Sequence, residues 1–279
     1  MWNIGIMQGR LTQPKGRGIQ FFPFDYWKEE FITAKEIGIE EIEFIFDYGN
    51  YKENPLWQGE GESVKKISDE TGVHIKSVCF DYFMRRPFYK YCDLERAEVL
   101  EENIRIINHI LNNMSQIGIQ LIEIPLVDNS ALKNEREMEE FRAFLLQVVN
   151  NAPDNILFDL ETDLAPKQFK EYLDTFEQAR IGANYDSGNS SGIGYLPYEE
   201  VTTLKDYIFN VHIKDRVYHG TTVELGTGSA DFSELFRGLK EIGYKGSFIL
   251  QAARGKEGLE KDTICRQCQF VKKWIETLR

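Results

Sequence analysis

Three residues whose side chains bind metal ions stand where three successive apolar segments end. Glu161 ends the segment Ile156-Leu-Phe-Asp-Leu-Glu161, Asp186 ends Gly182-Ala-Asn-Tyr-Asp186, and His212 ends Phe209-Asn-Val-His212. Two carboxylates and an imidazole form a set of ligands for a hard or borderline divalent cation, with coordination positions left open for substrate. For His212 alone, a hydrogen-bonded core histidine is the simpler interpretation. With the two carboxylates at equivalent points, the pattern favours a site for magnesium, manganese, cobalt or zinc.

The segments around these residues alternate between buried strands and helices along the whole chain. Short apolar runs, typical of parallel strands covered on their outer face, alternate with longer segments of helical spacing. The predicted strands are Ile4–Met7, Ile42–Ile45, Ile75–Cys79, Leu121–Ile124, Ile156–Leu160, Ile181–Tyr185, Phe209–Ile213 and Phe248–Gln251. The predicted helices span residues 26–37, 62–72, 94–117, 134–150, 165–178, 198–206, 231–242 and 259–278.

Eight such units predict a (β/α)8 TIM barrel, formed as a single domain by residues 1–279. A doubly wound open sheet is the competing fold, but no Gly-rich dinucleotide motif follows the first strand at Gly9. Glycines at 38, 72, 118 and 243 fall where a predicted helix gives way to a strand, as C-cap glycines do. Asp231 is predicted to cap the helix that follows it.

In a barrel of this type the functional groups lie at the C-terminal ends of the strands. The residues predicted there as contacts for substrate are Arg10, Glu43, Glu123, Asn189, Lys214, Arg216 and Arg254. Arginines gathered at one face of an acidic protein indicate an anionic ligand such as phosphate, and the amides of Gly226 and Gly228 could add donors. The alternative is that these arginines neutralise nearby loop carboxylates.

The segments Val211-His-Ile-Lys-Asp-Arg216, Leu225-Gly-Thr-Gly-Ser-Ala-Asp-Phe232 and Tyr185-Asp-Ser-Gly-Asn189 together resemble a known family. They are similar to the sugar-phosphate isomerase/epimerase branch of the xylose-isomerase-like barrels, and the resemblance extends over essentially the whole chain. It implies that Glu161, Asp186 and His212 are three of four metal ligands, that the cofactor is a divalent metal, and that the substrate is a carbohydrate, free or phosphorylated.

The fourth position departs from the family, because Gln251 stands where its characterised epimerases have a glutamate that also acts as acid or base. An amide oxygen can bind a metal but does not accept a proton at neutral pH. We therefore predict an aldose–ketose isomerisation through a metal-stabilised enediolate, with Glu161 as base and Gln251 as its neutral partner. A 3-epimerase of a ketose or ketose phosphate remains open, with a second base from Glu43, Glu123 or Asp128, and so does a barrel with lyase-like or lost catalysis.

The overall charge excludes other classes of function. A net charge of −12 and a pI near 5.0 argue against nucleic acid or an anionic membrane as partner. Four histidines do not suffice for the trinuclear zinc cluster of the DNA-repair endonucleases that share this superfamily. The Cys265 and Cys268 pair is predicted to lie on a helix face without a role. With no signal sequence or membrane span evident, the cytoplasm is the expected location, and the sequence leaves a homo-oligomer open.

Overall fold

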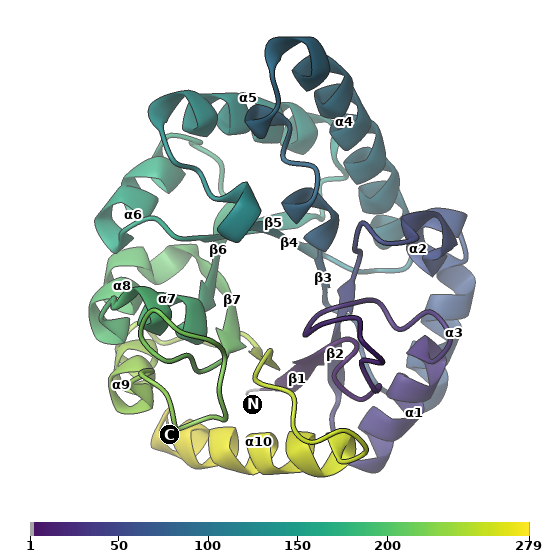
Figure 1. The fold of residues 1–279 in the computed structure, drawn as a ribbon, viewed down its shortest axis with the longest axis vertical. Helices are drawn as coiled ribbons and strands as arrows, with labels where there is room; N and C mark the ends of the chain where they lie inside the picture. Colours follow the sequence, from purple (N-terminus) through teal and green to yellow (C-terminus); the bar gives the residue numbers. More distant parts are fainter. Residues whose placement is uncertain (1–2, 279) are drawn as a thin grey trace.

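The protein, described here by a computed structural model covering residues 3–278, is a closed barrel of parallel strands. Figure 1 looks down the barrel, with the strands at the centre and the helices around them. The strands are β1 Ile4–Met7, β2 Glu41–Ile45, β3 Ser77–Cys79, β4 Leu121–Leu126, β5 Leu157–Thr162, β6 Ile181–Asp186, β7 Ile208–Ile213 and β8 Phe248–Leu250. Each pairs with the next, and β8 pairs with β1, so the predicted TIM barrel is confirmed. Residues 1, 2 and 279 of the predicted domain lie outside the described part of the chain.

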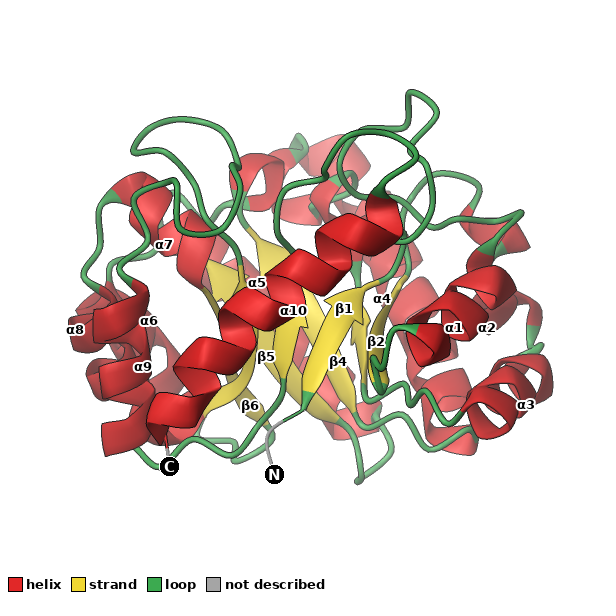
Figure 2. Cartoon of the chain, turned by 90° about the horizontal axis from the view of Figure 1, so that it is seen from below, coloured by secondary structure: helices red, strands yellow, loops and turns green. Residues whose placement is uncertain are grey.

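Helices cover the outer face of the barrel, as Figure 2 shows from the side. They are α1 Trp27–Glu36, α2 Pro55–Gln58, α3 Gly61–Thr71, α4 Asp93–Gln116, α5 Glu135–Asn151, α6 Pro166–Asp174, α7 Ser187–Ile193, α8 Pro197–Leu204, α9 Phe232–Glu241 and α10 Glu260–Ile275. Aromatic residues fill the space between sheet and helices: Phe44 of β2 packs on Trp27 of α1, and Phe248 of β8 on Phe236 of α9. Among the described residues, no helix has the length and apolar character needed to span a membrane.

The predicted helix ends agree with the backbone geometry. Gly38, Gly72, Gly118 and Gly243 all have positive φ, between 68° and 82°, the left-handed conformation in which glycine commonly ends a helix. Asp231 caps α9, since its side chain accepts a hydrogen bond from the Glu234 amide at 3.0 Å. Two differences stand out. β3 is shorter than predicted and starts at Ser77, and the short helices α2 and α7 were not predicted.

The interior of the barrel is polar where alternate strand residues point inward. Glu43 of β2 reaches Asn210 and His212 of β7, at 2.9 and 2.7 Å, although β1 and β8 separate these two strands in the sheet. These contacts therefore cross the lumen. Asp159, Asn184 and Asn210 belong to the same fully or almost fully buried set. The barrel thus encloses a hydrogen-bonded polar interior directly below the predicted site.

Candidate metal centre at the barrel mouth

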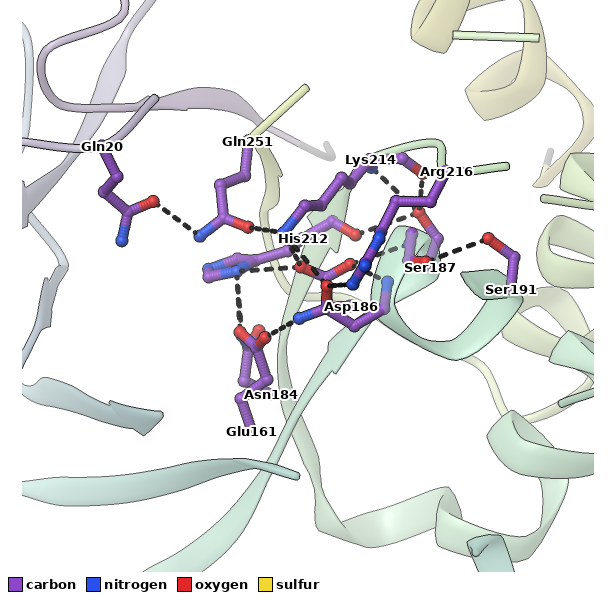
Figure 3. Close-up of polar contacts among 12 residues, drawn as sticks. Gln20, Glu161, Asn184, Asp186, Ser187, Ser191, His212, Lys214, Arg216 and Gln251 are labelled. Carbon is purple, nitrogen blue, oxygen red and sulfur yellow. Dashed lines mark hydrogen bonds and ion pairs between the residues drawn. The ribbon is translucent and has the colours of Figure 1, made fainter. Parts of the chain in front are cut away.

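Glu161, Asp186 and His212 meet at the C-terminal end of the barrel. Glu161 lies near the end of β5, Asp186 is the last residue of β6, and His212 pairs with Asp186 on the neighbouring β7. One potential ligand atom from each lies within 4.8 Å of the others, and all three residues are buried. Figure 3 shows the three side chains converging. The structure therefore brings together the three residues that the sequence predicted as metal ligands, and their donor atoms fit a divalent cation.

The His212 ring has a defined orientation within this cluster. Its Nε2 lies 2.7 Å from Glu43 Oε1, while Nδ1 faces Glu161 Oε2 at 3.4 Å and Asp186 Oδ2 at 4.0 Å. When Nε2–H donates to Glu43, as in carboxylate–histidine–metal arrangements, the Nδ1 lone pair faces the cluster; here it lies 3.0 Å from Asn184 Nδ2, a contact that a bound metal would replace. Burial alone would lower the pKa of His212, but the carboxylates of Glu43 and Glu161 outweigh it and raise the pKa well above its usual value.

Asparagine side chains and backbone amides fix the two carboxylates. Asn184 donates to Glu161 Oε2 at 3.1 Å, and Asn189 donates to the other oxygen of Glu161. Asp186 caps α7, because its Oδ1 accepts the amides of Gly188 and Asn189 at 2.8 Å, which leaves Oδ2 facing the cluster. Sequence reasoning missed Asn184. The available signal was its position two residues before Asp186, on the same inward face of the strand.

A cavity of about 650 Å³ opens above this cluster. Six of the residues predicted for the site line it: Glu123, Glu161, Asn189, Lys214, Arg216 and Gln251. Its wall also includes Asp81 and the exposed Arg85, which the sequence places at the functional face, and Gln20, Cys79 and the exposed Arg17, which the sequence did not single out. Asp186 and His212 lie just below its floor. The cavity is large enough for a sugar-sized ligand, and it combines carboxylate, amide and cationic groups.

Lys214 connects the acidic and the amide sides of the site. Its Nζ lies 3.3 Å from Asp186 Oδ2, 3.2 Å from Asn189 Oδ1 and 3.0 Å from Gln251 Oε1. Gln251 is buried, and its oxygen points toward the ligand cluster (Figure 3). Arg216 donates to Asn189 Oδ1 at 3.1 Å and to the carbonyl of Gly220, so it positions the loop after β7 and one wall of the cavity.

Arg10 and Arg254, both predicted as substrate contacts, donate to backbone carbonyls in this structure. Arg254 donates to the carbonyls of Gly9, Thr12 and Ile19, at 2.7 to 3.0 Å. Arg10 also donates to the Ile19 carbonyl, and to that of Gln251 at 3.3 Å. Neither residue lines the large cavity; both line a separate, smaller one. Their guanidinium groups are used by the backbone of the loop between β1 and α1.

Two further predicted groups have structural partners. Glu43 accepts hydrogen bonds from Ser77 and Asn210 in addition to its contact with His212, so it lies below the cavity and not in its wall. The amides of Gly226 and Gly228 both donate to Asp215 Oδ2 at 2.9 Å. They hold the loop after β7 together, and the predicted use of these amides as phosphate donors does not agree with this geometry.

Two buried acids in the lumen have no hydrogen-bond partner among the described residues. Both oxygens of Glu123 and both oxygens of Asp159 are in this state. Burial raises the pKa of each carboxyl well above its usual range, and Glu161 adds to the effect at Glu123 as Glu43 does at Asp159. These conditions favour the neutral, protonated acids.

A closed barrel with a buried cluster of two carboxylates and an imidazole at its mouth defines a TIM-barrel protein with a candidate metal centre. The chain belongs to the xylose isomerase-like TIM barrel family, whose profile matches residues 31–273. The family and the fold that the sequence predicted are therefore confirmed.

Individual relatives agree with this assignment. The L-ribulose-5-phosphate 3-epimerase UlaE of Shigella flexneri is 25% identical over 264 residues, which cover 88% of this chain and 89% of the relative. Among solved structures, an L-ribulose 3-epimerase has a TM-score of 0.77 at 17% identity, covering 100% of this chain and 96% of the other. The IolI protein, solved with a bound zinc atom, has a TM-score of 0.71 at 15% identity, covering 99% and 97%. Epimerases are isomerases, the class of enzyme that the sequence predicted.

Proposed function

We propose that the protein is a metal-dependent isomerase of a sugar or sugar phosphate, which moves a proton next to a substrate carbonyl with Glu161 as base. The observation that carries the proposal is the convergence of Glu161, Asp186 and His212 below a cavity of sugar size. A divalent ion bound there would supply a Lewis acid that polarises the carbonyl and acidifies the neighbouring C–H. Mn²⁺, Mg²⁺, Co²⁺ and Zn²⁺ are all candidates, and the zinc atom of IolI supports the choice of a divalent metal.

The surrounding residues prepare Glu161 for this task. Asn184 and Asn189 hold its two oxygens, so the carboxylate keeps one orientation toward the cavity. Lys214 places a positive charge beside Asp186 and Gln251, where it can stabilise negative charge that develops on a substrate oxygen. Proton removal by Glu161 and its return to the adjacent carbon give aldose–ketose isomerisation with a single base.

The relatives favour a second candidate, 3-epimerisation of a ketose or ketose phosphate. This reaction needs an acid or base on the opposite face of the substrate carbon. Gln251 has no ionisable proton to exchange, and Glu43 is fully engaged below the cavity. Glu123 is the best placed replacement, since it lines the cavity and its buried carboxyl has no protein partner. Asp128 is also in the cavity wall, at its exposed rim.

Incubation of free and phosphorylated ketoses in heavy water, with added Mn²⁺, tests the proposal. We expect deuterium at the carbon next to the carbonyl, and we expect Glu161→Gln to reduce its incorporation by at least about a hundredfold, since general bases contribute about 10²–10⁴-fold. Aldose formation identifies the isomerase and inversion at C3 identifies the epimerase. Absence of label from every sugar tested, with metal bound, would show that the proton-transfer chemistry is wrong.

The variant Gln251→Glu separates the epimerase candidate from the other two, the single-base isomerase and a barrel with lyase-like or lost catalysis. A gain of epimerase activity in this variant would indicate that the wild-type protein catalyses something else. The remaining expectations, a cytoplasmic location, no nucleic-acid or membrane partner and an open question of homo-oligomerisation, stay predictions. Substrate contact by Arg10, Glu43 and Arg254 also stays untested; from their present hydrogen bonds we propose positioning roles for all three.

A further inference from the structure

Gln251 differs from a glutamate in one respect that matters for metal binding: its two terminal atoms are not equivalent. Either oxygen of a carboxylate can face a cation, whereas an amide must turn its oxygen inward, because its NH₂ group only donates hydrogen bonds. A chain that has glutamine at this position therefore needs something to fix the orientation of the amide. This inference rests on the proposed metal-dependent function and on Gln251 as the fourth ligand, the position that the family resemblance assigns to it.

A chain of hydrogen bonds provides this orientation. Lys214 Nζ donates to Gln251 Oε1 at 3.0 Å, and Gln251 Nε2 donates to Gln20 Oε1 at 3.1 Å (Figure 3). Gln20 Nε2 in turn donates to Asp81 Oδ1 at 3.0 Å and faces Cys79 Sγ at 3.7 Å. The chain crosses the mouth of the barrel from the end of β7 to the end of β3.

The chemistry at the two ends determines the direction of the chain. A lysine ammonium group has only donors, so the Gln251 atom beside Lys214 must be the oxygen. An ionised carboxylate has only acceptors, so the Gln20 atom beside Asp81 must be the nitrogen. Burial raises the pKa of Asp81 to about 6, which leaves it a carboxylate at neutral pH and above. With both ends fixed, the oxygen of Gln20 can only meet the NH₂ of Gln251.

The backbone that carries Gln20 is also fixed. The carbonyl of its neighbour Ile19 accepts hydrogen bonds from both Arg10 and Arg254. Arg10 additionally donates to the Gln251 carbonyl at 3.3 Å, so one guanidinium group connects the two segments whose side chains pair. Gln20 is therefore held at the distance from Gln251 that the amide pair requires.

We propose that Gln20, held by Asp81, is a positioning residue that turns the Gln251 amide oxygen toward the metal centre. Gln20 belongs to a loop far from the metal ligands in sequence, and its role follows from the polarity of the hydrogen-bond chain. In a protein with glutamate at position 251 the same residue would be unnecessary. In such a protein Gln20 would be unfavourable, because its side-chain oxygen would face a carboxylate oxygen, and both are acceptors.

The proposal is tested by measuring metal affinity, with Mn²⁺ and Zn²⁺ titrated separately into metal-free protein at pH 7.5. Gln20→Leu is introduced into two backgrounds, the wild-type protein and the Gln251→Glu variant. In the wild-type background we expect Gln20→Leu to weaken metal binding about tenfold, the lower end of what loss of such a supporting contact costs. In the Gln251→Glu background we expect no weakening, because the carboxylate is symmetric. Gln13→Leu, an exposed position on the same loop, is the matched control and should leave the affinity unchanged.

Each outcome has a distinct meaning. An unchanged affinity in Gln20→Leu, or an equal loss in both backgrounds, would overturn the positioning role while leaving the metal centre intact. An equal loss would indicate general damage to the loop, which the thermal midpoint of the metal-free variants would also reveal. If the wild-type protein binds neither ion, the proposed metal centre falls and the inference falls with it.

Discussion

At the scale of single residues, the site depends on groups that hold the metal ligands in place. His212 can bind a metal only when its Nδ1 points to the space between the two carboxylates. The contact of Nε2 with Glu43 at 2.7 Å gives the ring this orientation. Glu43 was predicted to contact substrate. In the structure it does not line the cavity and accepts hydrogen bonds from three side chains, two of them across the lumen. Its influence on chemistry would therefore pass through the imidazole.

Glu43→Gln tests this influence. The amide oxygen can still accept from Nε2–H, but the negative charge that strengthens the imidazole as a ligand is lost. We expect metal affinity to fall about tenfold, and the thermal midpoint of the metal-free protein to fall as well, because the amide NH₂ takes the place of the oxygen that accepts from Ser77 and Asn210. Calorimetric titration with Zn²⁺ measures the effect, and the exposed neighbour Glu40→Gln serves as control. An affinity equal to that of wild type would show that Glu43 has only a packing role.

At the scale of elements, charged side chains hold the loop between β1 and α1 through its carbonyls and its amides. Arg254 binds three of its carbonyls, and Glu30 of α1 accepts from the amides of Gly9 and Leu11 and from the Thr12 hydroxyl, at 2.7 to 2.9 Å. The amides of this loop are thus held by the buried Glu30 of α1, and its carbonyls by the half-buried Arg254 from the loop between β8 and α10. This loop delivers Gln20 to the site, so its rigidity matters for the cavity wall.

Arg254→Met should release this loop. Hydrogen bonds from a charged donor each contribute about 1.5–3 kcal/mol, so losing even one should speed amide hydrogen exchange over residues 9–20 by about tenfold or more. Exchange is measured by mass spectrometry without any ligand. The exposed Arg266→Met is the control. A role confined to binding a substrate anion, as the sequence suggested, would leave exchange in the ligand-free protein unchanged.

The elements themselves were largely predictable, and the contacts among them were not. Apolar periodicity gave the eight strands, and strand order in a barrel then placed Glu161, Asp186 and His212 on adjacent strand ends. Helix α7 was missed because its sequence, Ser-Gly-Asn-Ser-Ser-Gly-Ile, has weak helix propensity and forms under the cap of Asp186. The pairing of Gln20 with Gln251 joins residues 231 positions apart and depends on side-chain geometry, which no local pattern contains.

The arginines show the same difference between a residue's position, which the sequence predicts, and its contacts, which the sequence does not predict. Their positions after strand ends predicted cations near the functional face, and Lys214 and Arg216 do line the cavity. Whether a guanidinium group meets a ligand or a backbone carbonyl depends on the path of the loops. For Arg10 and Arg254 the carbonyls of the β1–α1 loop lie within hydrogen-bond distance and satisfy them.

At the scale of the whole molecule, buried acids make stability depend on pH. Burial raises the pKa of Asp81 to about 6, of Glu30 to about 7 and of Glu200 to about 8. The ordinary pKa is 3.8 for Asp and 4.5 for Glu, so in the unfolded chain these acids lose their protons at lower pH. Between about pH 5 and pH 8 the folded state therefore binds more protons than the unfolded state, and the free energy of unfolding must fall as pH rises.

Glu200 should account for the upper part of this range. It lies on α8 and accepts hydrogen bonds from Ser190 of α7 at 2.9 Å and from Tyr185 of β6 at 3.3 Å, with the Asp186 carboxylate adding to the rise of its pKa. Up to about pH 8 the folded state keeps the proton of Glu200, which the unfolded chain loses near its ordinary pKa of 4.5, so each pH unit between these values lowers the free energy of unfolding by about 1.4 kcal/mol. Denaturant unfolding of metal-free protein from pH 5.5 to 9 should show stability that falls as pH rises toward 8 and levels off above it. Glu200→Gln should flatten that loss, and the exposed Glu199→Gln should not. An identical pH profile for Glu200→Gln and wild type would show that the acid ionises without cost, and that the contact between α7 and α8 does not depend on its proton.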